Sequence, residues 1–167
     1  MTNNIQQMTE EAVGLLQQLI KTPSVSRDEK AVADLMEQQM KLWGLAPKRV
    51  GNNLMLIGKH TEGKPTLLLN AHIDTVKPVS TWTRDPFTPT IEDGRLYGLG
   101  ANDCGGGLVS LLMVYRALCN EDLAYNLVYV ASAEEEVSGA NGFTLIRKQL
   151  PPIDVAIVGE PTGLQPA

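Results

Sequence analysis

Hydrophobic residues recur with helical spacing in three parts of the chain. In residues 8–21, apolar side chains stand three or four positions apart. A second such segment begins near Ser26, with Glu29 three residues later, a pairing typical of a helix-capping box, and it ends at Gly44. The third segment covers residues 108–118. We therefore predict three long helices, the first two separated by a short polar loop.

Shorter apolar runs predict strands. These runs cover residues 53–58, 66–71, 126–133 and 154–158, of which the last two are continuous enough to indicate buried strands. Glu92-Asp93-Gly94 predicts a hairpin turn, and residues 140–149 predict a further helix. Strands that alternate with helices indicate an α/β fold. We expect three layers: a mostly parallel sheet with helices on both faces.

Composition narrows the function classes. The chain has 167 residues, the size of one domain, and a formal net charge of −5 with a pI of about 5.0. This acidic balance argues against partners that are nucleic acids or anionic membranes. The sequence has no signal-peptide pattern and no apolar run of about 20 residues that could cross a membrane. Two cysteines, Cys104 and Cys119, fit reduced thiols in a cytoplasmic protein.

Polar residues with metal-binding chemistry follow the ends of the predicted strands or precede the third long helix. They are His72, Asp74, Asp103, Glu134, Glu135, Glu136 and Glu160. Ligands of open α/β sheets bind outside the carboxyl ends of the strands, so we expect these side chains to meet at one edge. One imidazole with several carboxylates is a zinc ligand set, and the carboxylates would repel one another without a cation.

Other interpretations of single clusters are weaker. The Gly98-x-Gly100-x-x-Asp103 segment resembles a dinucleotide-binding loop, but an aspartate in place of the last glycine would repel a pyrophosphate. Cys104 beside His72 could indicate a cysteine hydrolase, but the nearby acids oppose thiolate formation. A non-catalytic metal-binding module that keeps the fold is a third alternative. The coincidence of four clusters at one edge favours a metal centre.

The polar clusters resemble, in chain order, the motifs of the zinc-dependent aminoacylase, carboxypeptidase and deacetylase family. The matching segments are His72-Ile73-Asp74-Thr75-Val76, Gly98-x-Gly100-x-x-Asp103, Glu134-Glu135-Glu136 and Gly159-Glu160-Pro161-Thr162. Within this family, the stretch TWTRDPFTPTIEDGRLYGLGANDCGGG and the ending IVGEPTGLQP resemble the acetylornithine deacetylases of arginine biosynthesis. Succinyl-diaminopimelate desuccinylases and dipeptidases or carboxypeptidases share the same metal site and remain alternatives.

The resemblance implies a hydrolase that removes the acyl group from a small N-acyl amino acid. It implies two zinc ions, with cobalt or manganese as substitutes, held by His72, Asp103, Glu136 and Glu160. Asp103 would bridge the two ions, with His72 and Glu160 completing the first site and Glu136 binding the second. Asp74 would orient His72 through its second ring nitrogen. Glu135 would be the general base.

The chain also departs from the family. Members are longer, with an inserted domain that often forms a homodimer and a final histidine ligand near the C-terminus. We therefore expect residues 1–167 to be the amino-terminal part of a zinc-peptidase-like catalytic domain, with an incomplete second metal site and little activity alone. His60, in a polar loop, is expected to be exposed. Gly105 stands where the family often has lysine, and the family tends to place a cis peptide after the residue matching Asp103.

Overall fold

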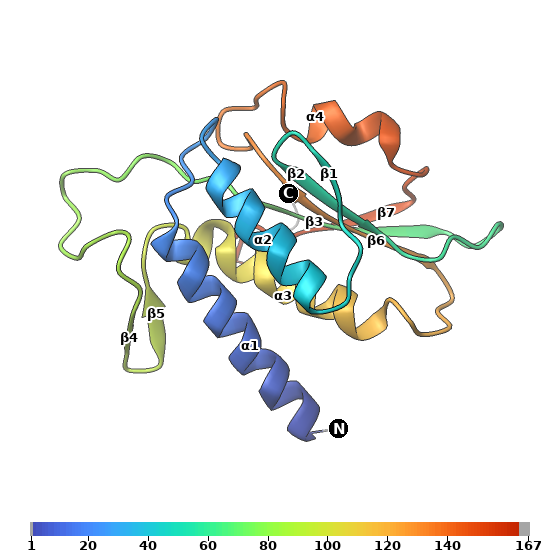
Figure 1. Ribbon diagram of the computed structural model, residues 1–167, viewed down its shortest axis with the longest axis horizontal. Helices are drawn as coiled ribbons and strands as arrows, with labels where there is room; N and C mark the ends of the chain where they lie inside the picture. Colours follow the sequence, from blue (N-terminus) through green and yellow to red (C-terminus); the bar gives the residue numbers. More distant parts are fainter. Residues whose placement is uncertain (1, 164–167) are drawn as a thin grey trace.

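A computed structural model describes residues 2–163, and within this range the main element is one five-stranded sheet of order β1-β2-β6-β3-β7 (Figure 1). Its strands are β1 (Lys48–Val50), β2 (Asn53–Ile57), β3 (Thr66–His72), β6 (Asn126–Ser132) and β7 (Val155–Val158). Strand β2 is antiparallel to both of its neighbours, whereas β3 pairs in parallel with β6 and β7. The other four strands thus run in one direction, which confirms the prediction of a mostly parallel α/β sheet.

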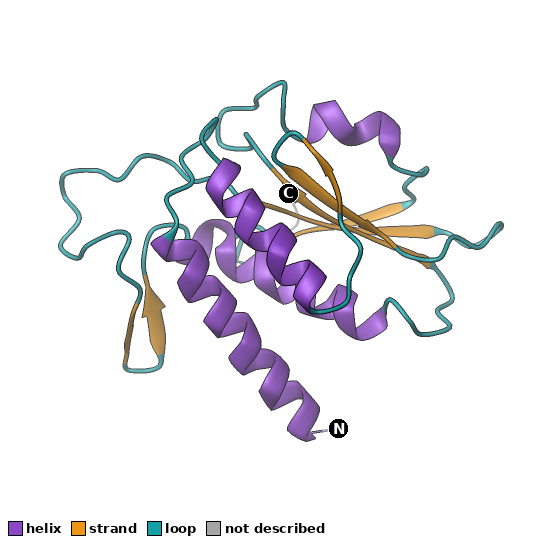
Figure 2. Ribbon diagram, in the orientation of Figure 1, coloured by secondary structure: helices purple, strands orange, loops and turns teal. Residues whose placement is uncertain are grey.

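Helices cover both faces of the sheet, so the three-layer prediction is confirmed (Figures 1 and 2). One face carries the long helices α1 (Thr2–Lys21), α2 (Lys30–Leu42) and α3 (Gly106–Leu118). The other face carries α4 (Phe143–Ile146) and the short turn η2 (Arg147–Gln149). The predicted helix over residues 140–149 is therefore reduced to these two short pieces.

Strand β6 lies inside the sheet and divides the hydrophobic core in two. Leu127 and Tyr129 belong to the larger cluster under α1, α2 and α3, whereas Val128 and Val130 belong to the smaller cluster under α4. Every residue of β6 is buried. A continuous apolar run is what a strand covered on both faces requires, because its side chains alternate between the two faces.

Strand β7 contradicts the prediction that residues 154–158 form a buried strand. All four of its residues are exposed, and the exposed fraction is 58% for Val155 and 48% for Ile157. In the described part of the chain, β7 pairs with β3 on one side and no strand follows it on the other. Its apolar sequence marked a strand correctly, but burial depends on neighbours that the local sequence does not specify.

The predicted capping box of the second helix is also wrong. Helix α2 begins at Lys30, after Glu29, and no side chain hydrogen-bonds at its N-cap. The side chain of Ser26 donates instead to Asp74, 48 positions further along the chain. The pattern Ser-x-x-Glu is present, but its two side chains form hydrogen bonds with residues far away in the sequence.

The predicted hairpin forms a separate two-stranded sheet of β4 (Thr90–Glu92) and β5 (Arg95–Tyr97). Both turn residues, Asp93 and Gly94, have positive φ, at 50° and 72°. This backbone matches the tight turn that an Asp-Gly pair favours between antiparallel strands. The hairpin projects from the body of the molecule beside the carboxyl-terminal end of α1 in the view of Figure 2.

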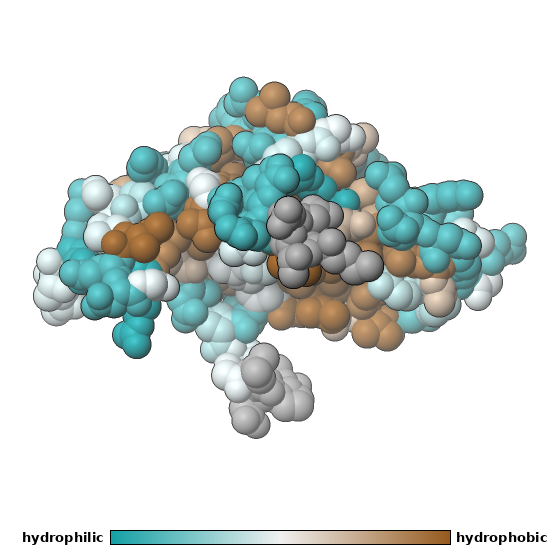
Figure 3. Space-filling model, turned by 90° about the horizontal axis from the view of Figure 1, so that it is seen from below, coloured by the Kyte–Doolittle hydropathy of each residue, from teal (hydrophilic) through white to brown (hydrophobic). Residues whose placement is uncertain are grey.

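Hydrophobic side chains also gather on the outer surface. Figure 3 shows an apolar area on the underside of the molecule. A groove between α1 and α3 is lined by Ile5, Met8, Val109, Met113 and Val114. None of the helices in the described range is both long and apolar enough to cross a membrane.

Candidate metal centre

The fold brings the predicted polar clusters together at the carboxyl ends of the parallel strands. His72 is the last residue of β3, the three glutamates 134–136 follow β6, and Glu160 follows β7. Asp103 lies in η1 (Ala101–Gly105), an irregular helical turn that leads into α3. The expectation that these segments meet at one edge of the sheet is met, because parallel strands end at the same edge.

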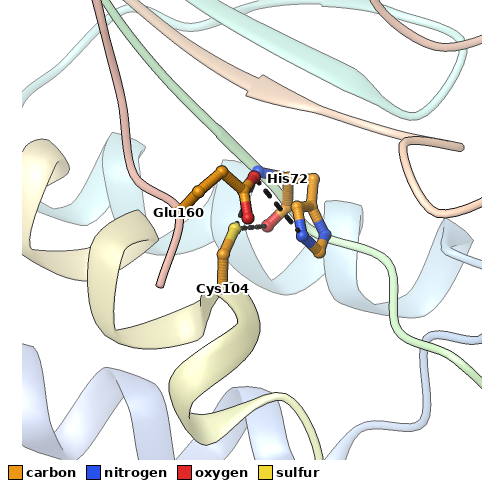
Figure 4. Close-up of side chains that lie close together, drawn as sticks. All are labelled: His72, Cys104 and Glu160. Carbon is orange, nitrogen blue, oxygen red and sulfur yellow. Dashed lines mark hydrogen bonds and ion pairs between the residues drawn. The ribbon is translucent and has the colours of Figure 1, made fainter. Parts of the chain in front are cut away.

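The imidazole of His72 is the centre of the cluster. Its Nε2 atom lies 3.1 Å from Oδ1 of Asp103, 3.7 Å from Oε1 of Glu160 and 3.9 Å from Oε2 of Glu135. Potential ligand atoms of His72, Asp103 and Glu136 all lie within 4.8 Å of one another. The same limit holds for His72, Cys104 and Glu160, which Figure 4 shows in contact.

Burial is distributed unevenly across the cluster. The side chain of His72 is 1% exposed, whereas those of Asp103 and Glu135 are 55% and 52% exposed. The imidazole thus lies at the buried end of the cluster, and the carboxylates lie between it and the solvent. A small molecule can reach the carboxylates from outside without any opening of the core.

The second ring nitrogen of His72 is held by Asp74, mainly through the backbone. Nδ1 lies 2.8 Å from the carbonyl oxygen of Asp74 and 3.5 Å from its carboxylate Oδ1. The carboxylate accepts a 2.7 Å hydrogen bond from the Ser26 hydroxyl. Burial would raise the pKa of Asp74, but hydrogen bonds from His72, Ser26 and two backbone amides hold it below its ordinary value. Our sequence interpretation did not assign Ser26 to this site.

Cys104 lies directly beneath His72 and contacts its backbone. The His72 amide donates to Sγ at 3.1 Å, and the thiol donates back to the His72 carbonyl at 3.3 Å. Burial raises the pKa of the Cys104 thiol. The peptide bond between Asp103 and Cys104 is cis, as the resemblance implies. These contacts give Cys104 a packing role under the imidazole and favour neither an exposed nor an ionised thiol.

Gly105 is a glycine because no side chain fits there. A Cβ atom at this position would lie 2.4 Å from the carbonyl oxygen of Gly100 and 2.6 Å from Cδ1 of Leu16. The family that the sequence resembles often has lysine at the matching position. In this chain, Gly105 lies in a close contact between η1 and α1 that leaves no room for a side chain.

The charges of the cluster are unbalanced in a way that suits a divalent cation. Burial and the neighbouring carboxylates raise the pKa of both Glu136 and Glu160. Burial by itself would lower the pKa of His72, but its contacts with Asp74 and Cys104 raise it to about 12. A cation among these oxygens would relieve the repulsion, and one imidazole with several carboxylates is a donor set that zinc accepts. The residues present therefore fit a metal ion.

His60, the second histidine, takes no part in the cluster. It is exposed in the loop between β2 and β3, at the amino end of β3. The metal centre lies at the carboxyl end of the same strand. His60 is exposed as expected and lies at the wrong end of the sheet to supply a ligand.

Comparison with known proteins identifies a family. The sequence profile of peptidase family M20/M25/M40 matches residues 68–167. The chain is 36% identical to acetylornithine deacetylase of Proteus mirabilis and 35% identical to that of Erwinia tasmaniensis, in each case over 92% of its own length. It spans only 43% and 44% of those two proteins.

A solved structure supports the same assignment at the level of the fold. The M20 family metallo-carboxypeptidase Sso-CP2 of Sulfolobus solfataricus superposes with a TM-score of 0.71 and 25% identity. The match covers 89% of this chain and 37% of the carboxypeptidase. The profile, the relatives and the superposed fold together show that this chain belongs to the M20/M25/M40 family of metallohydrolases.

Proposed function

We propose that this chain carries the metal-binding part of an amidohydrolase that removes the N-acyl group from an acylated amino acid. The observation that supports it best is the convergence of Asp103, Glu135 and Glu160 on one ring nitrogen of a buried histidine, His72. The identity to two acetylornithine deacetylases favours an acetylated basic amino acid as the substrate.

The metal ligands in this proposal are those that surround the imidazole. His72, Asp103 and Glu160 would hold one zinc ion, and Asp103 and Glu136 would contribute to a second, with cobalt or manganese as substitutes. When bound, the ions would polarise the scissile carbonyl and lower the pKa of water. Asp74 would keep Nε2 of His72 directed at the metal by holding Nδ1 from behind.

Glu135 is the residue best placed to move protons. Its carboxylate is half exposed and lies at the rim of the cluster, 3.9 Å from Nε2 of His72. Its backbone is fixed, because its amide donates to Asp74 at 3.1 Å. Glu135 would take a proton from the attacking water and deliver it to the leaving amine. The products would be a carboxylic acid and a free amino acid.

The proposal for the whole enzyme extends beyond this chain. Because the chain spans less than half of its curated relatives, residues 1–167 would correspond to the amino-terminal part of the catalytic domain. Residues outside this range would complete the second metal site, and an inserted domain would form the homodimer. The chain alone would then bind metal but show little hydrolytic activity.

Metal binding is the first test. Equilibrium dialysis against zinc should give about one tightly bound ion per chain, and Asp103→Ala should abolish it. Asp122→Ala is the matched control, because this aspartate is fully exposed and precedes β6, whereas the cluster lies at the other end of that strand. Zinc binding that survives Asp103→Ala would contradict the proposed ligand set.

Substrate class is the second test. Release of free amine would be measured with N-acetylornithine, N-succinyl-diaminopimelate and a dipeptide. The enzyme would be this chain fused to the part of the Proteus mirabilis deacetylase that it does not span. We expect N-acetylornithine to be hydrolysed fastest. Preference for the dipeptide would favour a carboxypeptidase, and no hydrolysis of any substrate would favour a non-catalytic metal-binding module.

A further inference from the structure

Two polar side chains of the loop between α1 and α2 contact segments that carry the metal centre. Ser26 donates to Oδ2 of Asp74 at 2.7 Å. Glu29, three residues later, is 1% exposed. Its Oε1 atom accepts the backbone amide of Glu134 at 3.3 Å, across 105 positions of sequence. The two residues that imitate a capping box therefore both contact segments of the candidate site.

As a result, three successive backbone amides donate hydrogen bonds to buried carboxyl groups. Glu134 donates to Glu29, as described, and Glu135 donates to Oδ1 of Asp74 at 3.1 Å. Glu136 donates to Oδ2 of the same aspartate at 3.2 Å. The segment that carries the proposed base and a proposed ligand is thus held by its main chain, leaving the side chains of Glu135 and Glu136 free to face the site.

The backbone at Glu134 needs such support. Its φ is 53°, in the left-handed region that residues with a side chain rarely adopt. Glu134 is itself buried, and its carboxyl oxygens accept from the backbone and side chain of Asn141. A left-handed residue between β6 and Glu135 turns the chain sharply at the point where the site begins.

Glu29 is fixed well enough to act as a support. Besides Glu134, its carboxyl group accepts the amide of Arg27 at 2.6 Å and the side-chain amide of Asn52 at 3.0 Å. Neither partner belongs to the metal cluster. The Glu29 carboxyl group is therefore anchored on the loop before α2 and on the β1–β2 turn, and it links both to the segment that follows β6.

We propose that Ser26 and Glu29 are positioning residues that hold the Glu134–Glu136 segment in the conformation the metal centre needs. Ser26 acts through Asp74, and Glu29 acts directly on the Glu134 amide. The inference rests on the proposed function for its consequence, because Glu135 and Glu136 matter only if they serve the site. We call the contacts of Ser26 with Asp74 and of Glu29 with the Glu134 amide the brace. The brace can be tested without metal or substrate.

Amide hydrogen exchange of the metal-free chain, followed by NMR, tests the brace directly. Glu29→Gln should reduce protection of the Glu134, Glu135 and Glu136 amides by about tenfold while β3 and β6 stay protected. Glu37→Gln is the matched control on α2, the helix that Glu29 precedes, since Glu37 pairs with Lys41 and Arg49 away from the site. Unchanged exchange in Glu29→Gln, or uniform loss of protection over the whole sheet, would overturn the proposal.

Metal affinity supplies the second measurement. Ser26→Ala should weaken zinc binding by about ten- to a hundredfold, the usual effect of removing a group that supports a ligand, and Ser26→Thr should restore it. Ser26 is only partly buried and lies in a loop, so this pair stays informative if Glu29→Gln fails to fold. Equal affinity in Ser26→Ala and the parent would contradict the proposal. A parent chain that binds no zinc would contradict the proposed function, while the exchange experiment would still judge the brace.

Discussion

Gly107, near the start of α3, lies directly against Gly159, the residue that follows β7. A Cβ atom at position 107 would stand 2.3 Å from the carbonyl oxygen of Gly159. The contact lets α3 approach the end of β7 closely enough to bring Glu160 to His72. Two glycines 52 positions apart thus set the position of one proposed metal ligand.

Gly107→Ala should therefore displace Glu160. We expect zinc affinity to fall by about tenfold or more, with a loss of about 1–3 kcal/mol in the free energy of unfolding. Calorimetric titration and urea denaturation would measure the two effects. Gly14→Ala is the matched control: no atom lies within 4 Å of a Cβ placed there in α1. It should stabilise the chain by about 0.5–1 kcal/mol and leave zinc binding unchanged.

Zinc binding should release a proton. The raised pKa of His72, about 12 against an ordinary 6.5, keeps the imidazole protonated in the metal-free folded chain at neutral pH. A zinc ligand must be deprotonated, so affinity should rise by about tenfold per pH unit through the neutral range, where the folded chain still carries this proton. Titration calorimetry in buffers of different ionisation enthalpy would count the protons. His60→Asn should leave the slope unchanged, and an affinity independent of pH would contradict the assignment of His72.

The same shift affects stability without metal. The folded state binds the His72 proton more tightly than the unfolded state, so this contribution is fully present below pH 6.5 and declines as pH rises toward 12. Urea denaturation of the metal-free chain should show a lower midpoint at pH 9 than at pH 6.5. A higher midpoint at pH 9 would show that another titrating group dominates in this range.

The two cysteines should differ sharply in reactivity. Burial raises the pKa of both thiols, but Cys104 is only 1% exposed, whereas Cys119 is partly buried. With iodoacetamide at neutral pH, we expect Cys104 of the folded chain to react about tenfold or more slowly than Cys119. Peptide mapping by mass spectrometry at successive times would give both rates. Equal rates in the folded chain, with both thiols modified early, would mean that the thiol beneath His72 is accessible.

Arg116 should be the main polar contact among the three long helices. From α3, its guanidinium pairs with Glu11 of α1 and lies 4.6 Å from the ring centroid of Trp43, beyond α2. Arg116→Ala should cost about 1–2 kcal/mol in the free energy of unfolding, and Arg116→Lys should recover little, because lysine lacks the planar group. Urea denaturation provides the measurement, with the exposed Arg147→Ala as the control. A full recovery by lysine would mean that charge alone matters.

Patterns with local causes were predicted well from the sequence. The apolar spacing of residues 8–21 marks α1, and Asp93-Gly94 marks its hairpin, because both signals act within a few residues. The meeting of the polar clusters at His72 was also predictable, since it follows from the rule that parallel strands end at one edge. That inference needed only the order of helices and strands along the chain.

Patterns whose outcome depends on distant partners were not predicted. Ser26 and Glu29 satisfy the local rule for a capping box, but Asp74 and the Glu134 amide compete successfully for the same side chains. The tertiary contact prevails because it fills groups that are buried and would otherwise lack partners. Residues 140–149 likewise favour a helix locally, yet only two short helical pieces form.

The exposed strand β7 has a consequence for handling the protein. Its open edge presents backbone groups that another strand can pair with, and Val155, Ile157 and Val158 offer apolar contacts on both faces. Strands of this kind are templates for aggregation. We expect this edge, rather than the metal centre, to set the concentration at which the chain remains monodisperse. A charged side chain on β7 is then the most direct route to samples concentrated enough for spectroscopy.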